Sequence, residues 1–184
     1  MRAEELIEII SRGEDSRHQF KENVTNVDAL AAEIVAFSNS RGGQIIIGVT
    51  DDGQIAGLSR DDINRLSNLI SNAANQHVRP PINPFTENVA FPDGLVIVLE
   101  IPEGISKPYM DNKGAIWVKS GADKRKVTSR EEMQRIFQAA GLIHADEVPA
   151  RGMNAADIDM DYFKKYFQKQ YGESIDDQVN LPVP

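Results

Sequence analysis

The 184-residue sequence contains no cysteine. This absence excludes disulfides, thiolate zinc sites and a cysteine nucleophile, and it is compatible with a cytoplasmic location, which we expect. No apolar run approaches about 20 residues, so we expect no membrane-spanning helix and no membrane partner. The acidic start, MRAEELIEII, has neither the apolar stretch nor the cleavage site of a signal peptide.

The sequence also lacks common catalytic and nucleotide-binding motifs. Its three histidines, His18, His77 and His144, fall on different segments, and neither HxxxH nor HExxH occurs, which argues against a zinc enzyme. No GxSxG string is present, so a serine hydrolase of that type is not expected. The stretch 48–54 has two glycines but no following lysine, and its two aspartates would repel phosphate. We therefore expect no cofactor and no metal site, apart from one alternative below.

Net positive charge is missing as well. The formal net charge is −8, which by itself argues against a strong nucleic-acid binder. The charge is unevenly spread, because residues 144–184 hold four Lys or Arg against eight Asp or Glu. Residues 107–130 hold only two Asp, against seven basic residues: Lys107, Lys113, Lys119, Lys124, Arg125, Lys126 and Arg130. This stretch is the only basic patch in the sequence.

Hydrophobic spacing and turn residues predict an α+β fold, with a mixed or antiparallel sheet of about six strands and helices packed on it. The predicted helices cover residues 3–12, 27–39, about 60–77 and 130–140. The predicted strands cover residues 17–24, 44–50, 55–58, 84–91, 95–101 and 115–119. Asn26, Ser59 and Ser129 stand where N-caps are expected, and Glu132 is placed for a capping box.

The most informative stretch covers residues 36–57, AFSNSRGGQIIIGVTDDGQIAG. It predicts a helix end, a Gly-Gly turn and a strand with three consecutive isoleucines, a run typical of a strand covered on both faces. The Asp51-Asp52-Gly53 turn then predicts a return strand, because Asp and Gly tolerate the positive φ of tight turns. This unit places two acidic side chains at its tip.

The sequence predicts a compact domain over residues 1–143 and a different segment over residues 144–184. Residues 144–156 have the composition of a linker. A helix is expected over Asp157–Tyr171, capped by Asp157 or Asp161. Its aromatic face holds four residues: Tyr162, Phe163, Tyr166 and Phe167. This face either packs back on the domain or begins a second module.

Four strings in order carry a resemblance to a known family: EDSRHQFK (14–21), the 36–57 stretch, KPY (107–109) and WVKSG (117–121). They resemble the E-x4-E-F-K strand, the glycine-rich core, the K-P element and the Y-x-R-x-G-S strand of the Schlafen-type AlbA-like domain. The resemblance covers roughly residues 5–142. It implies a DNA-binding domain of a bacterial transcriptional regulator, which in this family is often followed by a C-terminal winged-helix or ATPase module.

The resemblance also implies an alternative, because some Schlafen members are metal-dependent nucleases that act on RNA through three carboxylates. Glu14 matches the first position and Asp51 the third, but Gln19 stands at the second. A glutamine offers an oxygen without a charge, which should weaken the binding of Mg²⁺ or Mn²⁺. We therefore favour a role without catalysis, and keep Glu14 and Asp51 as the catalytic residues of the alternative.

Six residues are the candidate nucleic-acid contacts: Lys107, Lys119, Ser120, Lys124, Arg125 and Lys126. The cations could meet phosphates, while Ser120-Gly121 allows close backbone approach. A solvated loop before a helix is the competing interpretation. Trp117 is expected in the core rather than as a stacking platform. A second alternative function is a protein-interaction or homo-oligomerisation module, which would suit the acidic surface.

Overall fold

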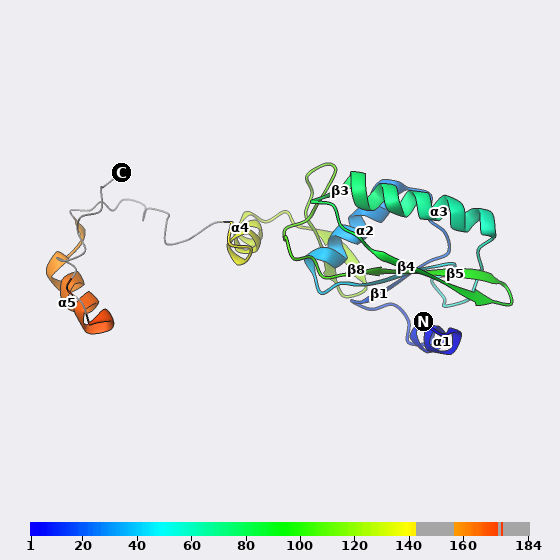
Figure 1. The fold of residues 1–184 in the computed structure, drawn as a ribbon, viewed down its shortest axis with the longest axis horizontal. Coiled ribbons are helices and arrows are strands. Elements are labelled where there is room, and N and C mark those ends of the chain that lie inside the picture. The colour runs from blue at the N-terminus through cyan, green and yellow to red at the C-terminus, as the bar shows by residue number, and fades with distance from the viewer. Residues whose placement is uncertain (143–156, 173, 175–184) are drawn as a thin grey trace. The chain divides into compact units, whose positions relative to one another are not determined.

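The structure is a computed structural model that describes residues 1–142, 157–172 and 174 (Figure 1). The chain divides into two units, residues 1–143 and 144–184. The first unit contains, in order, α1 (Ala3–Ser11), β1 (His18–Lys21), α2 (Val27–Asn39), β2 (Gly43–Ile47), α3 (Arg60–Asn72), the π-helical turn η1 (Ala73–His77), β3 (Val78–Arg79), β4 (Phe85–Phe91), β5 (Gly94–Ile101), β6 (Met110–Asp111), β7 (Trp117–Ser120), β8 (Asp123–Lys126) and α4 (Arg130–Ala139).

The main sheet has four strands in the order β1-β2-β5-β4. Strands β1 and β2 are parallel, with Gln19 opposite Ile45, whereas β2 and β4 each pair antiparallel with β5. Two further ladders, β3-β6 and β7-β8, have two strands each. The α+β class and the mixed sheet are confirmed. The eight strands of the described residues are spread over three sheets, because β3 pairs with β6 and β7 pairs with β8 outside the main sheet.

The isoleucines of β2 are buried on both faces of the sheet, as the sequence predicts. Ile45 and Ile47 belong to a core with α2 and α3, whereas Ile46 belongs to a second core with Leu6 of α1. Figure 1 shows the same layering, with α2 and α3 over one face and α1 against the other. Burial on both sides explains why this strand has no polar alternation.

Each predicted N-cap of the domain is observed. Asn26 Oδ1 accepts from Ala29 N at 3.0 Å, and Ser59 Oγ accepts from Asp62 N at 3.1 Å. Ser129 Oγ accepts from Glu132 N at 3.2 Å. The capping box expected from Glu132 does not form. Its carboxylate instead accepts two hydrogen bonds from the Arg125 guanidinium, at 2.6 and 2.9 Å.

Two stretches differ from the predicted strands. The return strand predicted over residues 55–58 forms only two isolated bridges, Val49 with Ile55 and Leu58 with Leu95. Between them, Ala56 N and Gly57 N both donate to the single carbonyl of Gly48, so no continuous ladder forms. Residues 119–126, interpreted as a binding segment or a solvated loop, lie mostly in the β7-β8 hairpin. In that hairpin Lys119 lies opposite Lys124, so the hairpin, rather than a loop, fixes where these cations project.

The second unit contains α5 (Met160–Tyr171). Its N-cap is Asp159, whose Oδ1 accepts from Tyr162 N at 2.9 Å, so both predicted caps, Asp157 and Asp161, are wrong. The aromatic rings follow each other along the helix, with centroids 6.5 Å apart for Tyr162 and Tyr166. The predicted linker over residues 144–156 and the residues from 175 onward lie outside the described residues.

Candidate functional site

The loop that ends α2 passes very close to the end of β5. Ser40 N and Gly42 N both donate to Phe37 O at 3.0 Å, which turns the chain sharply after the helix. Gly42 has a φ of 68°, and a Cβ there would lie 2.6 Å from Ile101 O. Only glycine fits this position without moving backbone. The Gly-Gly pair therefore places Ser40 and Arg41 beside the chain that leaves β5.

Asn39 holds two distant segments against this loop. Its Nδ2 donates to the carbonyls of Tyr109 and Trp117 at 2.8 and 2.9 Å, and its Oδ1 accepts from Tyr109 N at 2.7 Å. Lys107 and Lys119 each lie two residues from one of these anchored positions. The side-chain amide therefore fixes where both lysines approach the end of α2.

Seven residues line a cleft of about 510 Å³ at this place, which we call the cationic cleft: Ser16, Arg17, Ser40, Arg41, Glu103, Lys107 and Lys119. They come from the start of β1, the end of α2, the chain after β5 and strand β7. Four of the seven are basic and one is acidic. The cleft is therefore locally positive in a chain whose net charge is negative.

The cations of the cleft are held in different ways. Arg17 and Arg41 are exposed, and the Arg17 guanidinium donates to Arg41 O at 3.2 Å. Lys107 Nζ donates to Ser40 O and to Glu103, both at 2.7 Å. The hydrogen bond from Lys107, together with the charges of Lys107, Arg41 and Arg17, holds the pKa of Glu103 below its usual value. The carboxylate therefore stays charged and offsets one of the four cations.

Lys119 is the innermost cation. Its Nζ donates to Gln19 Oε1 at 2.9 Å and to Ala122 O, and it lies 4.7 Å from the centroid of the Phe37 ring. Burial lowers the pKa of Lys119, while the nearby charges of Glu33 and Glu14 act in the opposite direction. Its ammonium thus supplies positive potential from beneath the cleft rather than from the surface.

The six predicted nucleic-acid contacts are not gathered in one place. Lys107 and Lys119 line the cationic cleft. Lys124 pairs with Glu33 at 2.6 Å, and Arg125 pairs with Glu132. Ser120 and Lys126 are exposed at the ends of β7 and β8.

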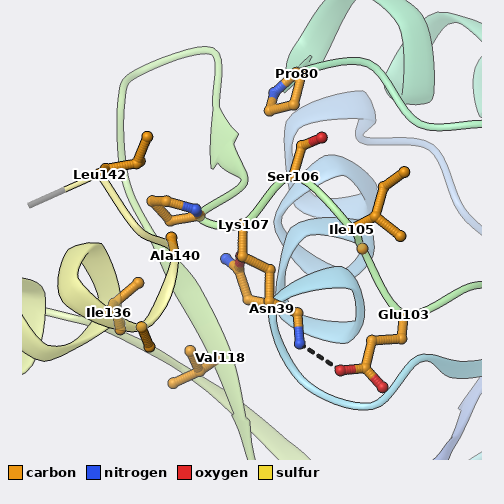
Figure 2. Close-up of a pocket in the computed structure, with 13 residues that line it drawn as sticks. Asn39, Pro80, Glu103, Ile105, Ser106, Lys107, Val118, Ile136, Ala140 and Leu142 are labelled. Atoms are coloured by element: carbon orange, nitrogen blue, oxygen red, sulfur yellow. Dashed lines mark hydrogen bonds and ion pairs between the residues drawn. The ribbon is translucent and has the colours of Figure 1, made fainter. Parts of the chain in front are cut away.

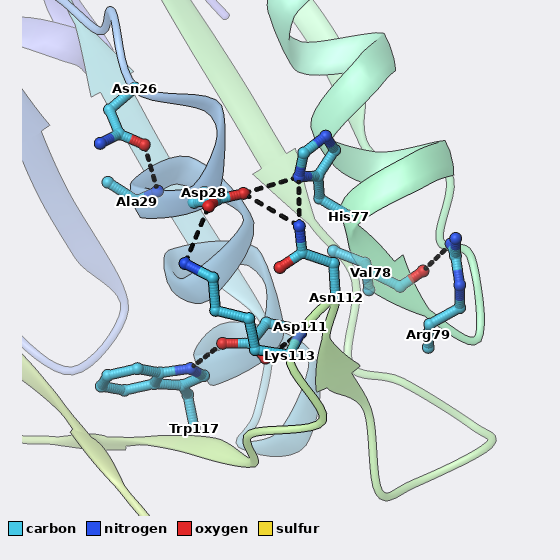
Figure 3. A network of polar contacts seen from close by, with 10 residues as sticks. All are labelled: Asn26, Asp28, Ala29, His77, Val78, Arg79, Asp111, Asn112, Lys113 and Trp117. Carbon is cyan, nitrogen blue, oxygen red and sulfur yellow. Dashed lines mark hydrogen bonds and ion pairs between the residues drawn. The ribbon is translucent and has the colours of Figure 1, made fainter.

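Outside those six, Lys113 is also held by an acid, because it pairs with Asp28 at 3.0 Å within a polar network at the start of α2 (Figure 3). The same network contains His77, whose Nδ1 lies 2.7 Å from Asp28 Oδ1. The predicted basic patch is therefore compensated by acids along much of its length.

The two residues of the nuclease alternative have different surroundings. Glu14 Oε1 accepts from Gln19 Nε2 and from Phe20 N, both at 2.6 Å. Asp51 is exposed at the tip of its turn. Within residues 1–142, 157–172 and 174, no group of three His, Cys, Asp or Glu side chains is arranged to hold a metal ion. Glu14 therefore anchors the start of β1 through Gln19 and Phe20.

Sequence reasoning missed Arg17 and Arg41. Both lie inside strings that carry the family resemblance, but at positions where the family pattern specifies no residue. All four strings contribute to the cationic cleft, through Arg17, Arg41, Lys107 and Lys119. The signal that could have found the two arginines is that every matching string contains a basic residue.

In the part of the chain that the structure describes, no helix has both the length and the apolar character needed to cross a membrane. No curated protein matches the sequence significantly.

The domain resembles a number of solved structures, including two that differ in how much of their own length it covers. The DIP2311 protein from Corynebacterium diphtheriae is 20% identical, with a TM-score of 0.50 over 74% of this chain and 28% of that chain. The other is the N-terminal domain of a protein described as related to the ATP-dependent DNA helicase RecG, from Nitrosomonas europaea. It is 18% identical, with a TM-score of 0.49 over 71% of this chain and 96% of that chain. The chain thus spans little more than a quarter of the DIP2311 protein, and that similarity concerns the fold.

The family model for Schlafen, AlbA_2 matches residues 14–128. This range includes every residue that lines the cationic cleft and covers well over half of the chain. The chain therefore belongs to the Schlafen AlbA_2 family.

Proposed function

We propose that this domain binds nucleic acid and that the phosphates lie on the cationic cleft. The observation that carries the proposal is the meeting of Arg17, Arg41, Lys107 and Lys119, from four separate segments, around one cleft with a single carboxylate. A phosphate backbone is the polyanion that such clusters bind most commonly. The family membership of the chain supports the same conclusion.

The exposed arginines are the primary phosphate contacts in this proposal. The planar guanidinium groups of Arg17 and Arg41 can each donate two parallel hydrogen bonds to a phosphate. Lys107, already shared with Glu103, adds a point charge. Ser16 and Ser40 add hydroxyl groups of the kind that often contact phosphate oxygens. Binding should thus depend on the two arginines more than on the ion-paired lysines.

The acidic remainder of the chain sets the strength of this binding. A net charge of −8 means that the chain as a whole repels a polyanion, which opposes the attraction at the cleft. We therefore expect moderate affinity at low salt and a steep loss of affinity as salt rises.

The proposal is tested by fluorescence anisotropy with labelled oligonucleotides at low salt. Arg17→Ala combined with Arg41→Ala should weaken binding by about tenfold or more, because two charge-assisted phosphate contacts are lost. The matched control is Arg12→Ala with Arg60→Ala, which removes the same charge from the C-cap of α1 and the first residue of α3, neither of which lines the cleft. Equal losses of affinity in the two double variants would overturn the proposal. The absence of any binding by the unchanged protein would overturn it as well.

We further propose DNA as the polymer and a bacterial transcriptional regulator as the context, on the basis of the family resemblance. A C-terminal winged-helix or ATPase module in a longer protein and a cytoplasmic location belong to the same proposal. Comparing matched DNA and RNA oligonucleotides in the anisotropy assay tests the choice of polymer. Tighter binding of RNA would contradict it.

The nuclease and the interaction module stay as alternative predictions. Cleavage of tRNA in Mn²⁺ that Asp51→Ala abolishes would favour the nuclease with Glu14 and Asp51. A defined homo-oligomer in solution, together with no gel shift at low salt, would favour the interaction module.

A further inference from the structure

An apolar groove of about 900 Å³ lies beside the cationic cleft (Figure 2). Ile105 and Ser106 lie on one side of this groove, and Ala140 and Leu142, from the end of α4 and the residues after it, lie on the other. Val118 is also among the residues that line it. Its size falls within the range of pockets that bury small organic ligands. Most of the lining residues are aliphatic, which favours an occupant that offers apolar surface.

The groove and the cationic cleft are adjacent. Both are lined by Glu103 and Lys107, whose ion pair at 2.7 Å stands at their shared border. A ligand that occupies both must therefore join an apolar group to an anionic one over a short distance. A nucleotide has this construction, because each phosphate is followed at once by a sugar and a base.

Three polar side chains of the groove, those of Asn39, Glu103 and Lys107, are already engaged. The side-chain amide of Asn39 makes three hydrogen bonds to Tyr109 and Trp117, and Lys107 is held by Ser40 and Glu103. These groups can therefore contribute little to the recognition of base edges. Contact with the flat face of a base requires no hydrogen bonds and tolerates any of the four bases.

Only an unpaired base can present its face to such a groove. In a duplex the faces are covered by stacked neighbours, and the grooves expose base edges alone. Ile105 is 98% exposed, so a base can reach it without any movement of the protein.

We propose that the apolar groove receives an unpaired nucleobase whose phosphate lies on the cationic cleft, so that the domain prefers single-stranded nucleic acid to duplex. This inference rests on the proposed function. It specifies a single-stranded polymer. It also gives the uncharged side chains of Ile105 and Leu142 a role in binding nucleic acid, through contact with a base.

The experiment compares one labelled single strand with the duplex of the same sequence, using the full chain at fixed low salt. The single strand should bind roughly fivefold to tenfold more tightly than the duplex. Ile105→Ser should remove most of this difference while the duplex affinity stays unchanged. Ile105→Trp should tighten binding of the single strand, because an aromatic ring stacks better on a base.

The matched control is Phe85→Ser, which changes another exposed apolar residue, 69% exposed on β4, outside the groove. This variant should bind both forms like the unchanged protein. Ile105 lies in an exposed loop, so its substitutions should not affect folding, and a thermal unfolding curve checks this.

The possible failures are distinguishable. If neither form binds, the proposed function falls and this inference falls with it. If both forms bind equally and the two Ile105 variants change nothing, the inference is overturned while phosphate binding at the cleft stands. An equal loss for Phe85→Ser would likewise overturn the assignment to the groove.

Discussion

At the scale of single residues, Asn39 connects the end of α2 to the two segments that supply Lys107 and Lys119. Its amide satisfies three backbone groups of Tyr109 and Trp117, at 2.7 to 2.9 Å. The position has no charge of its own, yet the geometry of the cationic cleft depends on it. A neutral side chain can therefore be as important to a charged site as the cations themselves.

Asn39→Ala should destabilise the protein by about 2 to 3 kcal/mol, because three backbone groups lose their partner in a partly buried place. Urea unfolding followed by circular dichroism measures this change. Asn75→Ala, which removes one exposed hydrogen bond to Ser71 O, is the control and should cost about 0.5 kcal/mol or less. Equal effects of the two substitutions would contradict the role given to Asn39.

Asp111 makes stability depend on pH in the acid range. Its carboxylate accepts from Trp117 Nε1 and Ala115 N at 2.8 Å and from Lys113 N at 2.9 Å. Burial alone would raise the pKa of Asp111, but these hydrogen bonds outweigh it and hold the pKa below its usual value. The stabilisation is therefore complete above the unfolded pKa of about 3.9 and is lost as pH falls through the lower, folded pKa.

Thermal unfolding measured between pH 6 and pH 2.5 tests this linkage. Asp111→Asn should lower the melting temperature at pH 6, and the difference from the unchanged protein should shrink as the pH falls. The fluorescence of Trp117, the single tryptophan of the chain, gives a convenient signal. Parallel curves for the two proteins across this range would contradict the prediction.

At the scale of elements, the β7-β8 hairpin is tied to α2 by Lys124 and Glu33. Glu33 is buried, and its Oε1 lies 2.6 Å from Lys124 Nζ. Lys124→Ala leaves this carboxylate without its ammonium group, so we expect a loss of about 2 to 3 kcal/mol in the free energy of unfolding.

Replacing both partners, with Glu33→Gln and Lys124→Met, should cost less than Lys124→Ala alone, because no buried charge is then left unpaired. Lys126→Ala, on the same strand but exposed, is the control for the hairpin. Chemical unfolding is measured for four proteins: the unchanged protein, Lys124→Ala, the double variant and Lys126→Ala. A double variant less stable than Lys124→Ala would show that the ion pair itself, rather than an uncompensated charge, governs stability here.

The helices and the main strands were predictable because their signals are local. The caps Asn26, Ser59 and Ser129 stand beside the apolar spacing that they begin, and the Ile45–Ile47 run is enough to indicate a buried strand. The capping box predicted at Glu132 is wrong, because Arg125 binds the same carboxylate and the local pattern does not show this competition. The pairing of strands into three sheets depends on contacts that no local pattern records.

At the scale of the whole molecule, charge could be counted from the sequence but not placed. The cations at 107–130 are consecutive in the sequence, yet Lys124 and Arg125 are held by acids from α2 and α4. Arg17 and Arg41 are isolated in the sequence, yet they meet Lys107 and Lys119 in space. Of the four cations of the candidate site, the sequence therefore predicted only Lys107 and Lys119. Charges that are neighbours in the sequence need not be neighbours in space.

The family itself was predictable, because each of the four motifs that carry the resemblance is continuous in the sequence. Their convergence on one cleft could be seen only in three dimensions, where the end of α2 gathers them through Asn39, Ser40 and the Gly-Gly turn. The family match over residues 14–128 spans all four strings.

The most direct test of the central claim, that phosphates lie on the cationic cleft, is the salt dependence of nucleic-acid affinity. The logarithm of the association constant is measured against the logarithm of salt concentration for the unchanged protein, for Arg17→Ala with Arg41→Ala, and for Arg12→Ala with Arg60→Ala. Each lost phosphate contact should make the slope shallower by about 0.7 to 0.9, so the cleft variant should lose roughly 1.5 while the control keeps the original slope. Identical slopes for all three proteins would contradict the account.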